Sequence, residues 1–107
     1  MSGPGRLRER LVLEAPAESG DGAGGVTRTF AEAATLWAEL TPLSARDVVM
    51  ADRALARVTH RIRIRWRSDV TTRHRLRSGA RLFRIVALRE AEAARRFLLI
   101  EAEELRA

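Results

Sequence analysis

The 107-residue chain has no cysteine, no lysine and no tyrosine, and only 5% of its residues are aromatic. Without cysteine there is neither a disulfide framework nor a thiolate metal site, so a reducing compartment is adequate. No apolar run approaches the roughly 20 residues that span a membrane, and the N-terminus does not lead into a signal-peptide core. These absences favour one small, soluble, cytoplasmic domain with no membrane contact.

Charge is abundant but unevenly placed. All 20 basic residues are arginine, and the formal net charge is +6. Residues 57–89 hold 11 arginines and one acid, whereas residues 1–56 and 90–107 each carry two more acids than bases. A basic centre between acidic flanks suits contact with a polyanion, and it suits ion pairing between subunits equally well.

The clearest local pattern occupies residues 59–67, THRIRIRWR, where apolar residues alternate with arginine. Period-2 alternation over nine residues predicts a half-buried strand. Its apolar face holds Ile62, Ile64 and Trp66. Its opposite face carries a row of four arginines: Arg61, Arg63, Arg65 and Arg67.

Further strands are predicted at residues 8–14, 26–30, 35–40, 73–77, 81–88 and 97–103. In this prediction Pro16 ends the first strand, and residues 17–25 form a flexible glycine-rich loop. Phe83 is placed on the face opposite Leu82 and Ile85. Five to six short strands with polar or glycine-rich turns predict an all-β fold, a small antiparallel β-barrel or sandwich.

A long segment separates the early strands from the basic strand. Residues 41–44 break the strand pattern, and Ser44 is a suitable N-cap for a short helix over residues 45–56. The apolar residues there form no clean stripe, so we expect a loop with a helical turn. Just before it, Trp37 is predicted on the face opposite Leu36 and Leu40.

Few residues are candidates for chemistry. His60 lies on the apolar face of its strand, which favours a hydrogen-bonded structural histidine over a metal ligand, and His74 stands fourteen residues away. Glu101 and Glu103 share one strand face, where a solvated or arginine-paired setting is favoured over acid–base catalysis. The loop 20–25 contains an acid and no following lysine, so it is a poor phosphate cradle. We predict no catalytic, cofactor-binding or metal site, and no small-molecule substrate.

The row of four arginines allows two interpretations. A line of guanidinium groups matches repeated phosphates of a nucleic-acid backbone. Modules that stack on bases expose aromatic side chains among the basic ones, whereas Trp66 falls on the apolar face here. Recognition of base sequence is therefore not predicted, and pairing with acids of this chain or of a neighbouring copy is at least as well supported as phosphate contact.

An ordered set of segments extends over roughly residues 6–106. It comprises an opening LRERL strand ending at Pro16, a Gly/Asp loop, LWAEL with PLS directly behind it, the strand VTHRIRIRWR, a GARLFRI hairpin arm and a final apolar strand ending in acids. In this order the segments resemble the head-closure (stopper) proteins that join head and tail in tailed bacteriophages and gene transfer agents. The chain departs from that family at Trp66, where tyrosine is frequent, and in its glycine-rich first loop.

The resemblance implies one β-barrel domain over residues 1–107, with flexible 1–5 and 17–25, that assembles into a homo-oligomeric ring below the portal and adaptor proteins. Such a ring retains packaged double-stranded DNA in the filled head and presents a docking face to the tail terminator or tail tube. The implied location is the bacterial cytoplasm during assembly and then the phage-like particle. The four-arginine row would meet neighbouring subunits or the DNA channel.

The resemblance also implies a gate. In this family the long segment before the basic strand can project toward the channel, and it corresponds here to residues 42–56. The charged residues of that segment would then contact neighbouring subunits or DNA; they are Arg46, Asp47, Asp52 and Arg53.

Two other functions compete with the ring-forming connector. A monomeric, sequence-independent nucleic-acid-binding β-barrel would hold short DNA or RNA with an affinity that falls steeply with salt. A small hydrolase would lose activity on substitution of His60 or Glu101, and we expect no such loss.

Overall fold

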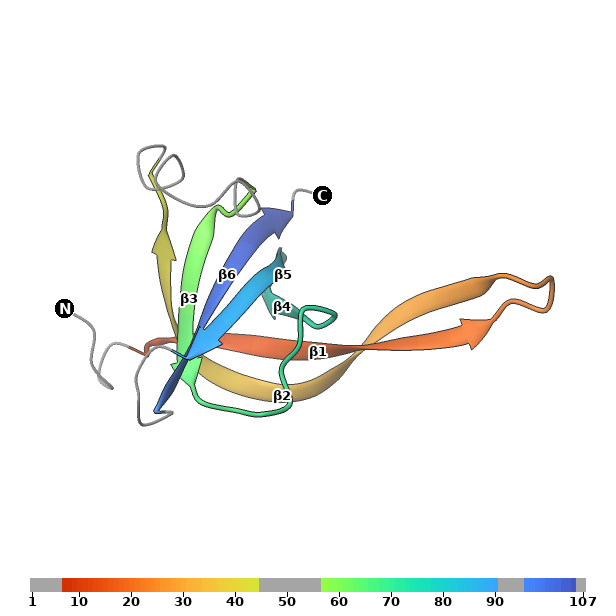
Figure 1. The fold of residues 1–107 in the computed structure, drawn as a ribbon, viewed down its shortest axis with the longest axis horizontal. Coiled ribbons are helices and arrows are strands. Elements are labelled where there is room, and N and C mark those ends of the chain that lie inside the picture. Colours follow the sequence, from red (N-terminus) through yellow and green to blue (C-terminus); the bar gives the residue numbers. More distant parts are fainter. Residues whose placement is uncertain (1–6, 45–56, 91–95, 106–107) are drawn as a thin grey trace.

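The computed structural model describes residues 7–44, 57–90 and 96–105, and these form six antiparallel strands without a helix (Figure 1). The strands close into a barrel in the order β1-β2-β3-β6-β5-β4, which confirms the predicted all-β fold. Their bounds are β1 Glu9–Gly20, β2 Val26–Pro42, β3 His60–Arg65, β4 Arg75–Ser78, β5 Arg81–Glu90 and β6 Phe97–Leu105.

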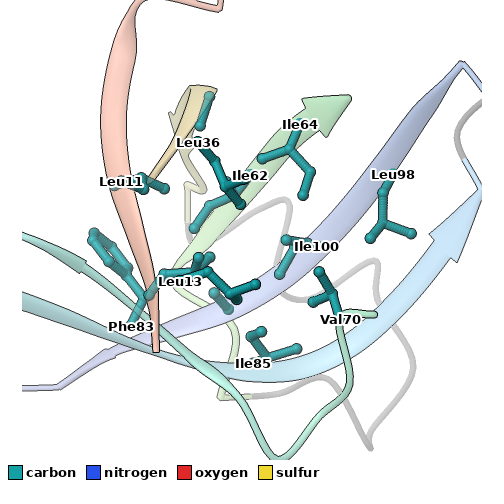
Figure 2. Close-up of a cluster of buried hydrophobic side chains, with 13 residues drawn as sticks. Leu11, Leu13, Leu36, Ile62, Ile64, Val70, Phe83, Ile85, Leu98 and Ile100 are labelled. Atoms are coloured by element: carbon teal, nitrogen blue, oxygen red, sulfur yellow. The ribbon is translucent and has the colours of Figure 1, made fainter. Parts of the chain in front are cut away.

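The barrel interior is filled by one side of each strand, because alternate residues of a strand point to opposite faces. Ile62 and Ile64 of β3 are at most 1% exposed, as the alternation of residues 59–67 predicted, and Trp66 packs against the core from just beyond the strand. Figure 2 shows the apolar side chains of several strands meeting inside the barrel. Each fully buried leucine, isoleucine or phenylalanine contributes about 1.5–3 kcal/mol by leaving water.

One prediction about the core was wrong. Phe83 is fully buried on the same face as Ile85, not opposite to it, and Leu82 is only half-buried. The prediction grouped Ile85 with Leu82 although the two lie three residues apart, whereas the strand period of two places Phe83 and Ile85 on one face. A β-bulge follows Ile85, because Ile85 pairs with Ala102 of β6 and Ala87 already pairs with Glu101, so the alternation shifts by one position only beyond Ile85.

The first two strands are much longer than the barrel needs. β1 pairs with β4 only over Val12–Glu14 but with β2 along its whole length, from Glu9 to Gly20. Residues 15–31, hereafter the arm, therefore leave the barrel as a two-stranded ribbon (Figure 1). The molecule measures 51 × 29 × 27 Å as a result.

Two further predictions about this region were wrong. Pro16 does not end the first strand, because β1 continues through it and pairs Pro16 with Phe30. Proline is tolerated in an edge strand, where its missing N–H can face away from the ladder, and this part of β1 lies beyond its pairing with β4. The predicted loop over 17–25 is consequently reduced to residues 21–25, between the two long strands.

Other turns follow the prediction. The strands around residues 73–77 and 81–88 are β4 and β5, and Gly79 in the turn between them adopts φ 59°, a left-handed conformation that glycine accepts most easily. The expected continuation of the second strand through 35–40 is confirmed, since β2 is continuous. The predicted helical turn over 45–56 lies outside the described residues.

Candidate assembly interface

Most of the basic block is neutralised within the barrel. At least seven of the 11 arginines in residues 57–89 make ion pairs with carboxylates of the described residues, and all but one of these acids lie on β1, β2 or β6. The central strands and the acidic flanks thus meet across the sheet. The seven are Arg67, Arg73, Arg75, Arg77, Arg81, Arg84 and Arg89.

The tightest of these contacts lies where the arm leaves the barrel. Glu14 is 6% exposed and accepts hydrogen bonds from Arg75, at 2.5 Å, and from Arg77, at 3.0 Å. Burial acts to raise the pKa of Glu14, but the two hydrogen bonds and charges outweigh it, and the pKa lies below its ordinary value. Arg77 also pairs with Glu32, and Arg75 lies 4.0 Å from the centroid of the Phe30 ring.

A β-bulge coincides with this cluster. Leu13 pairs with Ala34, whereas the next residue of β1, Glu14, pairs with Glu32, so β2 carries one extra residue. Bulges bend a strand and increase its twist. The bulge therefore bends the ribbon where the arm departs, beside Glu14 and its arginine partners.

Ion pairs continue along the arm. Glu18 accepts a hydrogen bond from Arg28 on the opposite strand and another from Arg73, which precedes β4. In the turn, Asp21 accepts hydrogen bonds from the backbone amides of Ala23 and Gly25. The backbone amides lower the pKa of Asp21, and Arg28 is the main cause of a lowered pKa at Glu18, so both carboxylates stay ionised at neutral pH.

The predicted arginine row does not behave as one unit. Arg61 and Arg65 are exposed on β3, while Arg63 is half-buried with its guanidinium carbon 4.0 Å from the centroid of the Phe97 ring. Arg67 lies beyond the end of β3 and forms a bidentate ion pair with Asp69, at 2.7 and 2.9 Å. The row thus offers two exposed guanidinium groups rather than four.

A second exposed feature lies on the outer face of β2. Trp37 is 56% exposed, opposite Arg10 of β1, whose guanidinium carbon lies 5.5 Å from the centroid of the indole ring. Trp37 and Arg65 together line two surface hollows, one shared with Leu7 and Arg8. The indole therefore lies among arginines. The alternation of residues along the strand correctly predicted that Trp37 lies outside the core, but it did not indicate the neighbouring arginines.

His60 is a structural residue in its strand. It is 9% exposed, its ring meets Phe83 edge-on at 5.2 Å between centroids, and its Nδ1 lies 3.0 Å from the Thr59 hydroxyl. Burial lowers the pKa of His60; Glu104 opposes this shift and Arg81 adds to it. The prediction of a hydrogen-bonded strand histidine is confirmed.

The carboxylates of β6 are paired with arginines of β5, which is one of the two settings expected for Glu101 and Glu103. Glu101 is 3% exposed although it points outward, because Arg89 covers it and donates to it through Nε at 3.1 Å and through a second guanidinium nitrogen. Arg84 donates to Glu103 at 2.9 Å. These groups are held as ion pairs on the outer barrel wall.

The remaining candidates divide by location. His74 contacts the hydroxyl and the backbone amide of Thr71 through Nδ1. The gate residues Arg46, Asp47, Asp52 and Arg53 lie outside the described residues. Over residues 7–44, 57–90 and 96–105, no group of three or more His, Asp or Glu side chains gathers to hold a metal ion. The same residues include no helix long and apolar enough to cross a membrane.

Comparisons with known proteins agree with one another. A family model described as phage head completion protein matches residues 3–105. A protein from Shigella flexneri 2a, with a structure determined in solution, is 29% identical at a TM-score of 0.79, covering 96% of each chain. A chain from the virion of a native gene transfer agent particle is 32% identical at a TM-score of 0.70, covering 94% of this chain and 96% of that one. The comparison with curated proteins gives no match.

Proposed function

This chain belongs to the phage head completion protein family, and from that premise we propose that it forms a ring between the portal or adaptor and the tail. It is a head–tail structural protein of a phage-like particle, as its resemblance to head-closure proteins indicated. In the proposed role, the ring closes the filled head, retains the packaged DNA and presents the docking face for the tail.

One observation carries the proposal. The match to the family covers residues 3–105, and the relative from the gene transfer agent virion shares 32% of its residues over nearly the whole of both chains. Likeness at that level extends to the barrel and the arm together. The comparisons therefore support a role in assembling the particle better than the barrel fold alone would support any role.

The charge distribution supports a connector more than a free nucleic-acid-binding protein. A binding face for a polyanion needs several arginines directed at phosphates, whereas most arginines of the basic block already pair with carboxylates. Arg61 and Arg65 remain exposed, and we assign them to a neighbouring subunit or the channel wall. Residues 42–56 are assigned to the gate on the family resemblance.

The direct test is assembly without this chain. Particles produced in its absence should contain heads that package DNA and then lose it, together with unattached tails. Nuclease-resistant DNA and electron micrographs of the particles measure both effects, and supplying the wild-type chain should restore them. Tailed particles that keep their DNA without this chain would contradict the proposal.

A second test separates the two assignments of the exposed arginines. Arg61→Gln and Arg65→Gln in one variant should reduce the amount of this protein in the particle if the residues face a neighbouring subunit. If they face the channel, the ring stays at full occupancy and DNA leaks faster from the head. Arg57→Gln is the matched control, because Arg57 is exposed just before β3 but outside the row.

The competing function has its own measurement. A monomeric nucleic-acid-binding barrel would bind free duplex at micromolar concentration in physiological salt, with an affinity falling steeply as salt rises. The purified chain should instead show only weak duplex binding. Micromolar binding together with particles that contain no ring would replace the connector with that function.

A further inference from the structure

The arm extends from the barrel, and the groups that reach it from the barrel side include two arginines: Arg75 lies over the Phe30 ring, and Arg73 donates to Glu18. Beyond Glu14 its strands pair only with each other, and all side chains of residues 17–29 are exposed. Val26, at its outer end, is 65% exposed. Isolated two-stranded ribbons are marginal in water and leave hydrogen-bonding edges open on both sides, so such an arm gains stability by lying against another chain.

The surface around Trp37 has the composition of a binding anchor. A large exposed indole with guanidinium groups around it is the residue combination that concentrates binding energy at protein interfaces. Arg10 lies directly across from Trp37, and Arg65 lines the same hollows as Trp37. We call these three residues the Trp37 surface. It is basic and apolar at once, so it fits an acidic segment that also presents an apolar side chain.

The outer end of the arm has that complementary chemistry. Residues 18–26 contain two acids, no basic residue and the exposed Val26; Glu18 already pairs with Arg28 and Arg73, so the acid that the turn offers to a partner is Asp21. Asp21 is fixed in the turn by its hydrogen bonds to Ala23 and Gly25. The turn therefore presents its carboxylate in one defined position, which limits the conformational entropy lost on binding.

The two surfaces lie at opposite ends of β1. The Trp37 surface is anchored at Arg10, near the start of the strand, and the arm turn begins after Gly20. Ten residues of extended strand span roughly 34 Å. Figure 1 shows the β1–β2 ribbon projecting away from the barrel. The end of the arm is therefore remote from the Trp37 surface of its own molecule, and only the Trp37 surface of another copy can receive it.

We propose that the outer end of the arm, residues 18–26, docks on the Trp37 surface of the adjacent copy of this chain. The contact joins two different patches, so it repeats head to tail and closes a ring when the rotation between copies is right. This inference rests on the proposed ring and specifies which surfaces hold it together. In this contact Val26 lies against the indole, while Asp21 approaches Arg10 and Arg65.

The absence of cysteine permits a direct cross-linking test. A double variant, Val26→Cys with Thr35→Cys, puts one thiol at the arm end and one beside Trp37, because Thr35 is exposed and lines the same hollow. In assembled particles, a short thiol-to-thiol cross-linker should give a ladder of covalent multimers. Val26→Cys with Ala80→Cys is the matched control, since Ala80 is exposed in the β4–β5 turn, and it should give no ladder.

A second variant measures the strength of the contact. Trp37→Ala removes a side chain outside the core, so the barrel should unfold at the wild-type denaturant concentration while association between copies weakens by at least roughly 30-fold. The readout is occupancy of this protein in particles, with Leu105→Ala as control because Leu105 is also exposed, at 38%.

The outcomes separate this inference from the proposed function. A ring that forms normally with Trp37→Ala and yields no arm-to-Trp37 ladder overturns the docking contact and leaves the connector role standing. Full occupancy combined with faster DNA leakage in Trp37→Ala also overturns it, in favour of a nucleic-acid contact. Wild-type particles without any ring overturn both.

Discussion

The barrel and the arm are formed by the same two strands but held by different interactions. In β1, Leu11 and Leu13 are fully buried, whereas every residue from 17 to 20 is exposed. Burial of apolar surface stabilises the first half of the strand, and cross-strand pairing with a few ion pairs holds the second. The barrel is thus held by its own apolar core, whereas the arm is a projecting ribbon without a core.

The boundary between the barrel and the arm lies at Glu14. Glu14 is the residue at which the β1–β2 register shifts, and it is also the acid clamped by Arg75 and Arg77. The cluster of Glu14, Arg75 and Arg77 therefore lies at the junction between the core and the arm. The comparison can therefore be tested at three levels, in the core, at the junction and in the arm itself.

The largest effect is expected in the core. Phe83→Ala removes the largest fully buried side chain and should lower the free energy of unfolding by about 3–5 kcal/mol, because a cavity remains in the closed barrel. Denaturant unfolding followed by circular dichroism measures it. Val26→Ala, at the arm end, is the control and should leave the unfolding midpoint unchanged. Equal losses in the two variants would show that the arm is part of the cooperative core.

The junction should give a smaller, pH-dependent effect. Glu14→Gln keeps the shape but removes the charge that Arg75 and Arg77 neutralise, and should cost about 1–2 kcal/mol at pH 7. Because the folded pKa of Glu14 lies below its ordinary 4.5, its contribution is present above about pH 4.5 and is lost as pH falls through the folded value. The difference between wild type and variant should therefore narrow in acid.

Unfolding of both proteins at a series of pH values from 7 to 3 tests this expectation. A difference that stays constant to pH 3 would contradict the assigned cause. Glu32→Gln provides the control, because Glu32 shares Arg77 but is exposed. Its effect at pH 7 should be smaller than that of Glu14→Gln.

The barrel was predictable from the sequence where its strands alternate without interruption. Residues 59–67 indicated strand β3, its buried isoleucines and the outward arginines, because a single period ran through the whole segment. The placement of Phe83 was wrong because Ile85 was grouped with Leu82 by apolar character, whereas the period of two places Phe83 and Ile85 on one face. Beyond Ile85 a bulge shifts the alternation, and that shift is set by pairing with β6 and leaves no local signature in the sequence.

The arm was predictable only in part: a strand over 26–30 was expected, but not its pairing with a first strand that continues through Pro16. Pro16 and the glycines of residues 20–25 are ordinary signals for a strand end and a loop, and no core face exists in the arm to restore periodicity. Glu14 looked like any polar strand residue, because its partners Arg75 and Arg77 lie some 60 residues away. The alternation of residues predicted that Trp37 lies outside the core, but the arginines beside it are brought there by pairing between strands.

A third prediction returns to the barrel and concerns His60. Burial holds the folded pKa of His60 below its ordinary 6.5, so the neutral form is favoured in the barrel. Its contribution to stability is present above pH 6.5 and is lost as pH falls from 6.5 toward the folded value. His60→Gln should make unfolding less pH-dependent between pH 7 and 5, whatever the variant's stability at pH 7. If the pH dependence of unfolding is unchanged in His60→Gln and lost in His74→Gln, it does not arise from His60, and this prediction is wrong.

The smallest energetic effect, and the sharpest contrast between the two regions, is expected in amide hydrogen exchange. In the purified chain, amides of residues 17–29 should exchange through local opening, while amides of β3 and of β6 beside it should exchange only near global unfolding. Arg28→Ala should accelerate exchange in the arm further without changing the barrel, because Arg28 pairs with Glu18 across the ribbon. In assembled particles the arm amides should become protected if the arm lies on a neighbouring copy. Arm amides that are as slow as those of β3 in the isolated chain would show that the ribbon needs no partner, and the distinction between a barrel held by its own core and a partner-seeking arm would be lost.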